Sequence, residues 1–150
     1  MSLYTVRRKL TILQVEDSES DAALVAYAFR RIANQHAIHL VKDGLEALRF
    51  LRRGEAYADV PRPDLILLDI GLPGLDGLEV LREIKLDQTL KDIPVIMFSS
   101  SETSAVLRDA YSLQANSYVV KPPGFEAYMQ AIESIESYWA NVAALPEIHA

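Results

Sequence analysis

The chain has 150 residues, of which half are hydrophobic and 24% are charged, a composition typical of one soluble globular domain. It contains no cysteine, which excludes disulfides, thiolate metal sites and cysteine nucleophiles. The formal net charge of −6 argues against nucleic acid as the main partner, because phosphate binding needs basic patches.

Hydrophobic runs in the sequence are short. They are far shorter than the roughly 20 residues that span a bilayer. Residues 1–6 lack the apolar core of a signal peptide, so we expect a cytoplasmic protein.

The first predicted element is a strand over residues 10–15, which is apolar and is followed directly by Glu16 and Asp17. Apolar residues at helical spacing then predict a helix. Ser18 or Ser20 can cap this helix, and the acidic residues around them suit its positive N-terminal end.

A short second strand is predicted over residues 37–41. The helix after it is expected to begin at Asp43 and to end at Gly54, a natural C-terminal stop. Residues 55–62 predict a loop, since two nearby prolines are incompatible with regular structure.

The third strand, residues 65–68, is an unbroken apolar run that stops at Asp69. Such a run predicts a strand buried on both faces, as in a parallel sheet covered by helices. A loop rich in glycine and proline follows, and the third helix is expected to begin near Asp76.

Two further strand and helix pairs complete the chain. The strands are predicted over residues 95–98 and 116–120, and the helices over about 103–113 and 125–139. Five strands therefore alternate with five helices, which predicts an α/β fold with a doubly wound parallel sheet.

Polar side chains collect where these strands end. Glu16 and Asp17 follow the first strand, Asp69 the third, Ser99 the fourth and Lys121 the fifth. The carboxyl ends of parallel strands meet at one edge, so the three carboxylates would lie close together and repel one another. A divalent cation with a preference for oxygen ligands, Mg²⁺ or Mn²⁺, would resolve this repulsion.

The other two groups at this edge suit a phosphoryl group. Lys121 offers a positive charge and Ser99 a hydroxyl donor, and phosphoryl transfer depends mainly on positioning and charge stabilisation. The carboxylate of Asp69 can act as a nucleophile and form an acyl phosphate.

On these residues the chain resembles the receiver domain of response regulators, a flavodoxin-like fold in which a sensor histidine kinase donates phosphate to an aspartate. The resemblance covers about residues 10–139. It leaves residues 1–9 as an N-terminal extension and residues 140–150 as a C-terminal tail.

The resemblance implies a role for each matching position. Asp69 would be the phosphoacceptor and a metal ligand. Asp17 would bind the metal directly, Glu16 through water, and Gly71 through its backbone carbonyl.

It also implies a switch. Ser99 matches the hydroxyl residue that moves to the phosphoryl group, and Tyr118 matches the aromatic residue whose rotamer follows phosphorylation. Lys121 matches the lysine of the site, which in the family often precedes a cis peptide, here the bond to Pro122.

Segments outside the site are similar to the single-domain regulators that are paired with bacterial and cyanobacterial phytochromes. These segments are residues 61–69, 113–122 and 137–146. Gly71 stands where an asparagine is often found, and Ser101 lies two residues after the switch position. Both positions help to set the lifetime of the acyl phosphate in the family.

The main hypothesis is therefore a stand-alone phosphoacceptor in two-component signalling, not an enzyme with an external substrate. It would accept phosphate from a sensor histidine kinase, with a phytochrome-type kinase suspected. A phosphatase of the haloacid-dehalogenase type is an alternative, but it needs a second aspartate where this chain has Gly71. A pseudo-receiver that signals by binding alone is a third, disfavoured by the intact acidic set.

Simpler interpretations apply to several side chains. Ser99 could be a helix cap and Tyr118 could be sheet packing. His36, His39 and His149 lack any partner pattern in the sequence and are interpreted as surface or packing residues. Aromatic residues in the last two helices exceed what one sheet face needs. We therefore expect a homodimer through the fourth helix, fifth strand and fifth helix.

Overall fold

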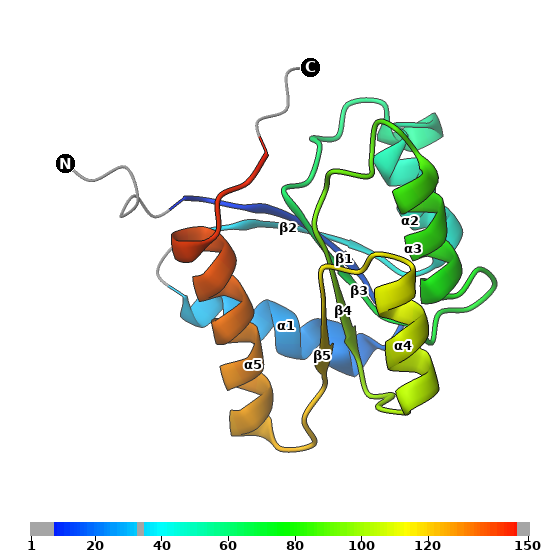
Figure 1. Ribbon diagram of the computed structural model, residues 1–150. Coiled ribbons are helices and arrows are strands. Elements are labelled where there is room, and N and C mark those ends of the chain that lie inside the picture. Colours follow the sequence, from blue (N-terminus) through cyan, green and yellow to red (C-terminus); the bar gives the residue numbers. More distant parts are fainter. Residues whose placement is uncertain (1–7, 33–34, 147–150) are drawn as a thin grey trace.

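In the computed structural model, one sheet of five parallel strands lies between two layers of helices (Figure 1). The structure describes residues 8–32 and 35–146. Most of the predicted N-terminal extension, the end of the predicted tail and His149 lie outside the described residues.

The strands follow the predicted alternation with the helices. They are β1 (Thr11–Val15), β2 (Ala37–Val41), β3 (Leu65–Leu68), β4 (Val95–Ser99) and β5 (Ser117–Val120). The helices are α1 (Glu19–Arg31), α2 (Gly44–Leu51), α3 (Gly77–Leu86), α4 (Ser104–Ser112) and α5 (Phe125–Ser137). The strand order β2-β1-β3-β4-β5 confirms the predicted doubly wound, flavodoxin-like fold.

Two apolar cores lie on opposite faces of the sheet. Alternate strand residues such as Leu13, Ile66 and Met97 pack under α2, α3 and α4. Their neighbours, such as Ile12 and Leu67, pack under α1 and α5. Figure 1 shows these two helix layers. Every residue of β3 and β4 is buried, which explains why β3 is wholly apolar and β4 is apolar up to Ser99.

Polar caps begin four of the helices. In each case a side-chain oxygen accepts a hydrogen bond from the amide three residues further on: Ser18, Asp43, Asp76 and Thr103. Ser18, and not Ser20, is the cap of α1.

The end of α2 differs from the prediction. Arg53, and not Gly54, takes the left-handed conformation, with φ of 55°. The amide of Gly54 donates to the carbonyl of Arg49 at 2.9 Å and that of Arg53 to the carbonyl of Phe50 at 3.1 Å. This pair of bonds is a Schellman motif, so the glycine lies one residue beyond the strained position.

Two short turns were not predicted. A 3-10 turn, η1 (Glu55–Tyr57), lies inside the expected loop, and a π-helical turn, η2 (Tyr138–Val142), continues α5 beyond Ser137. In η2 the amide of Ala143 donates to the carbonyl of Tyr138 at 2.8 Å, a bond between residues five apart. No helix among the described residues is long and apolar enough to cross a membrane.

Candidate functional site

The predicted site residues meet at the carboxyl edge of the sheet. Glu16 and Asp17 directly follow β1, Asp69 follows β3, Ser99 is the last residue of β4, and Lys121 follows β5. Because all five strands are parallel and the order places β1, β3, β4 and β5 side by side, these residues share one edge.

Three carboxylates form the centre of this edge. Each of Glu16, Asp17 and Asp69 offers an oxygen, and these oxygens lie within 4.8 Å of one another. Glu16 is buried, Asp69 is half-buried and Asp17 is exposed, so the cluster opens to solvent on one side. Such a set of hard oxygen donors fits a divalent cation of the Mg²⁺ or Mn²⁺ type, with room for waters as further ligands.

Lys121, which directly follows β5, places its ammonium group against this cluster. Its ammonium Nζ lies 2.5 Å from Oε1 of Glu16 and 3.2 Å from Oδ2 of Asp69. Its side chain is only 6% exposed. A third carboxylate, Asp21 of α1, lies 3.1 Å from the same nitrogen. The lysine ammonium therefore contacts three carboxylates at once.

Burial and charge give these groups unequal protonation. Burial is the main cause that raises the pKa of Glu16 to about 7, aided by the charge of Asp69 and opposed by Lys121. Burial acts on Asp69 in the same direction, but the charge of Lys121 and hydrogen bonds outweigh it and lower the pKa. Asp69 thus remains ionised, as a nucleophile must be.

Lys121 remains a cation for a related reason. Burial alone would lower its pKa, yet hydrogen bonds and charge from Glu16 and Asp69 raise the pKa above its usual value. A permanent positive charge beside Asp69 is what the oxygens of a transferred phosphoryl group require.

The backbone after β3 fixes the position of Asp69. Its carboxylate Oδ1 accepts a hydrogen bond of 2.7 Å from the amide of Ile70. The amide of Gly77 donates to the carbonyl of Ile70 at 2.9 Å. A Cβ at Gly77 would lie 2.0 Å from the carbonyl oxygen of Asp69, so only glycine permits this approach of α3. Gly71, in contrast, is exposed, and a Cβ at that position would meet no atom within 4 Å.

The predicted switch residues lie beside β4 and β5. Ser99 is 3% exposed, and its Oγ accepts a hydrogen bond of 3.3 Å from the amide of Ser101. The hydroxyl of Tyr118 donates to the carbonyl of Ser101 at 2.6 Å. The loop after β4 is therefore bonded to both side chains.

The predicted cis peptide is wrong. No peptide bond among the described residues is cis, so the bond from Lys121 to Pro122 is trans. The trans form is the intrinsically preferred isomer of a bond before proline, by about 0.5–1 kcal/mol.

Two residues of the site region escaped the sequence analysis. Asp21 contributes to the environment of Lys121, and the hydroxyl of Tyr128 in α5 donates to Oδ1 of Asp21 at 3.1 Å. In the sequence, Asp21 is one more acid at a helix N-terminus and Tyr128 one more core residue, so neither pattern carries a functional signal.

His36 is a packing residue, as predicted, but it also has two polar partners that the sequence pattern did not indicate. Its Nδ1 accepts a hydrogen bond of 2.8 Å from the amide of Leu10, and its Nε2 lies 2.8 Å from Oε1 of Glu136. The side chain is completely buried. His39 packs against Phe50, as a packing residue would.

Known proteins are similar to this chain in sequence and in fold. The sequence profile of the family described as "Response regulator receiver domain" matches residues 12–133. Response regulator Rcp1 of Synechocystis sp. is 38% identical over 135 residues, which cover 90% of this chain and 92% of Rcp1.

Two solved structures are similar along nearly the whole chain. The phosphorylated cyanobacterial phytochrome response regulator RcpA has a TM-score of 0.90 and 40% identity, and the match covers 93% of this chain and 100% of RcpA. The Mn²⁺-bound form of Rcp1 has a TM-score of 0.87 and 38% identity, with 92% and 99% covered.

Proposed function

The chain belongs to the response regulator receiver family, and on that premise we propose that Asp69 accepts a phosphoryl group from a sensor histidine kinase. The observation that carries the assignment is the environment of Asp69. It is the ionised carboxylate that shares both the acidic cluster and the ammonium of Lys121.

In the proposed transfer, a carboxylate oxygen of Asp69 attacks the phosphorus of a phosphohistidine. A P–O bond forms and the P–N bond breaks, and the histidine nitrogen leaves with the electron pair. Lys121, 3.2 Å from Asp69, would offset the charge of the phosphoryl oxygens. The product is an aspartyl phosphate at the edge of the sheet.

A divalent cation fits the acidic cluster, and we propose Mg²⁺, with Mn²⁺ as an alternative. Glu16, Asp17, Asp69 and the backbone carbonyl of Gly71 would hold it, and when bound it would neutralise phosphoryl oxygens.

The sequence also argues against a phosphatase of the haloacid-dehalogenase type, because Gly71 occupies the position of the acid/base aspartate that such an enzyme needs.

We propose that the protein catalyses only its own phosphorylation and dephosphorylation. Gly71 and Ser101 lie two residues after the acceptor and the switch residue, and small residues at these positions would leave room for a hydrolytic water. A partner kinase of this type would place the protein in the cytoplasm.

The switch would act through Ser99 and Tyr118. Movement of the Ser99 hydroxyl to the phosphoryl group would break its bond to the amide of Ser101. Since Tyr118 is bonded to the carbonyl of the same residue, its side chain would then be released. This local change in hydrogen bonding would thus shift the equilibrium between two conformations of α4 and β5.

We propose a phytochrome-type kinase as the donor. RcpA supports this pairing, because it is described as a cyanobacterial phytochrome response regulator and the match covers 100% of its chain. Rcp1 is similar over nearly the same length. Phosphotransfer from a phytochrome-type kinase, compared with transfer from an unrelated histidine kinase, tests the pairing.

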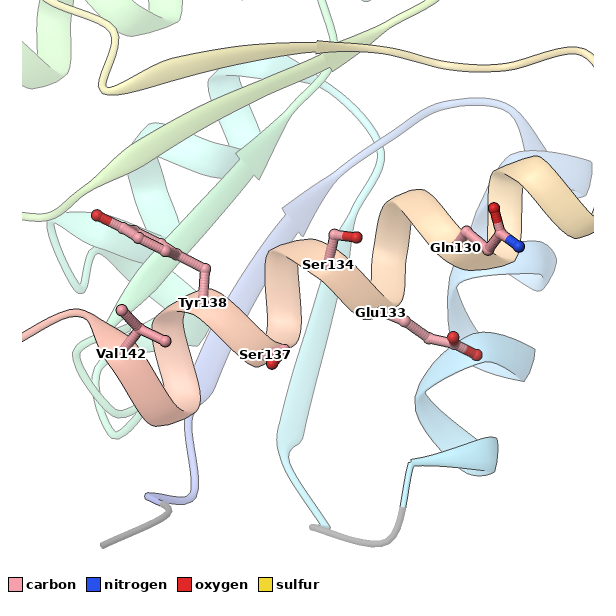
Figure 2. A pocket seen from close by; sticks show the side chains of 6 residues that line it. All are labelled: Gln130, Glu133, Ser134, Ser137, Tyr138 and Val142. Carbon is pink, nitrogen blue, oxygen red and sulfur yellow. The ribbon is translucent and has the colours of Figure 1, made fainter. Parts of the chain in front are cut away.

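A second copy of the chain is the partner proposed for the α4, β5 and α5 surface. β5 is an edge strand of the sheet, and edge strands are commonly covered or paired. Beside it, Tyr138 is 51% and Val142 71% exposed. Figure 2 shows these two side chains at the C-terminal end of α5 and in η2, where they line a pocket of about 540 Å³ with four polar residues.

Labelling with a small phosphodonor tests the proposed acceptor. Incubation with acetyl phosphate and Mg²⁺ should add one phosphoryl group to the intact protein, measured by mass spectrometry. Asp69→Asn should remove the label, and Asp59→Asn, at an exposed acid in the loop before β3, should keep it. A label that persists in Asp69→Asn would contradict the assignment.

A further inference from the structure

The ammonium of Lys121 has three hydrogen-bond donors and three carboxylate neighbours. Two of them, Glu16 and Asp69, belong to the acidic cluster. The third, Asp21, lies outside that cluster, in the first turn of α1, with Oδ2 at 3.1 Å from Nζ. All three donors of the lysine are therefore occupied.

Asp21 is itself held in place from two sides. Its backbone amide donates to the cap residue Ser18 at 3.2 Å. Its Oδ1 accepts from the hydroxyl of Tyr128 at 3.1 Å, while Oδ2 faces Lys121. Tyr128 is 4% exposed and its ring packs edge-on against Phe98, with ring centroids 5.3 Å apart.

Phosphoryl transfer would affect the three contacts of Lys121 differently. A phosphoryl group on Asp69 would take the place of the Asp69 contact, and a cation in the acidic cluster would compete for Glu16. Asp21 takes part in neither event. It is the contact that can persist throughout the reaction.

We propose that Asp21 is a positioning residue, which tethers the Lys121 ammonium between α1 and α5 so that its other N–H groups point at the phosphoryl oxygens on Asp69. Tyr128 supports the tether by holding the second oxygen of Asp21. This inference rests on the proposed function, because it concerns the rate of the same transfer. It goes beyond that function by assigning a role to two residues outside the acidic cluster.

A rival explanation is that Asp21 only stabilises the N-terminus of α1 and its packing on α5. In that case its removal would lower stability without a specific effect on transfer. Glu19 provides the matched control, because it is an acid in the same helical turn but is exposed to solvent.

The test measures the rate of labelling by acetyl phosphate at saturating Mg²⁺ in the full-length protein. We expect Asp21→Ala to lower the rate about tenfold, since misplaced catalytic groups slow transfer strongly. Asp21→Asn should restore the rate to within about threefold of wild type, because an amide oxygen can still accept from Lys121. Glu19→Ala should match the wild type.

Two further readouts separate positioning from metal binding and from folding. The Mg²⁺ dissociation constant, measured by calorimetry, should change less than about threefold in Asp21→Ala, because one charge outside the cluster is removed. Tyr128→Phe should slow labelling in the wild-type background and should add nothing in the Asp21→Ala background, as expected for residues in one network.

The inference is overturned if Asp21→Ala is labelled as fast as Glu19→Ala, or if Tyr128→Phe and Asp21→Ala act independently. It is also overturned if the whole effect is a weaker Mg²⁺ affinity. Should Asp21→Ala fail to fold, Tyr128→Phe carries the comparison, and a Tyr128→Phe variant that is labelled as fast as Glu19→Ala overturns the inference. If the wild type takes no label on Asp69, the proposed function itself fails.

Discussion

Charge balance at the sheet edge depends on a few side chains. One lysine contacts three carboxylates, and burial raises the pKa of Glu16 to about 7 because it disfavours the charged form. Asp17 is the exception, since it is exposed and no bond to Lys121 is found for it within the described residues. Its charge is therefore the one most available to a metal ion.

This difference makes Asp17→Asn a specific test of the metal site. In wild type, Mg²⁺ at about 100 times its dissociation constant should stabilise the fold by about 2.7 kcal/mol. Asp17→Asn should lose most of that gain, while its stability in EDTA should stay within about 0.5 kcal/mol of wild type. Thermal unfolding with EDTA and with Mg²⁺ measures both quantities.

Glu19→Gln is the control for that experiment, because it removes a nearby exposed charge that lies outside the acidic cluster. Equal Mg²⁺ stabilisation in Asp17→Asn and Glu19→Gln would exclude Asp17 as a ligand.

At the scale of single residues, the sequence predicted the site residues that follow strands and missed the site residues that lie on helices. Asp69 and Lys121 could be predicted because a parallel sheet brings strand ends together whatever their separation in the chain. Asp21 and Tyr128 meet only because α1 and α5 pack side by side on one face, and no sequence pattern specifies how two helices are rotated against each other.

The contact between elements that matters most for Asp69 is the start of α3 against the end of β3. Gly77 allows this contact, because a Cβ there would lie 2.0 Å from the carbonyl oxygen of Asp69. Gly77→Ala should therefore destabilise the fold by about 1–3 kcal/mol, although alanine is the better helix former. Chemical denaturation measures the change.

Gly71→Ala is the matched substitution in the same loop. No atom lies within 4 Å of a Cβ at that position, so the stability should change by less than about 0.5 kcal/mol. If the two variants have equal stability, the backbone approach at Gly77 does not control the position of α3.

Helix starts were predictable because capping residues act locally, as Asp43 and Asp76 do. The hydrogen-bonded link between β1 and α5 could not be predicted from such local signals. His36 accepts from the amide of Leu10 through Nδ1, so its Nε2 carries the proton that it shares with Glu136, which lies 100 residues away. Nothing near His36 in the sequence indicates so distant a partner.

At the scale of the whole molecule, we propose that the switch signals by a change in dimerisation. The proposed interface combines the edge strand β5 with the exposed side chains of α5 and η2 (Figure 2). A two-fold interface places the same side chains on both copies. One charged substitution therefore introduces two charges into the contact.

Sedimentation equilibrium tests this assembly. Wild type with beryllofluoride and Mg²⁺ should sediment as a dimer, and Tyr138→Asp should weaken association by about tenfold or more, as removal of a central aromatic contact does. Leu45→Asp, at an exposed leucine of α2, should dimerise like the wild type. A wild type that stays monomeric at high concentration, with and without beryllofluoride, would exclude the dimer.

The phosphoryl group resides on Asp69 in the proposed mechanism, and its position can be measured directly. After labelling with acetyl phosphate and Mg²⁺, reduction with borohydride converts an aspartyl phosphate into homoserine, which peptide mass spectrometry can locate. We predict homoserine at position 69, dependent on Mg²⁺ and on the phosphodonor. Homoserine at another position, or an unmodified Asp69 in a protein that carries the label, would contradict this assignment.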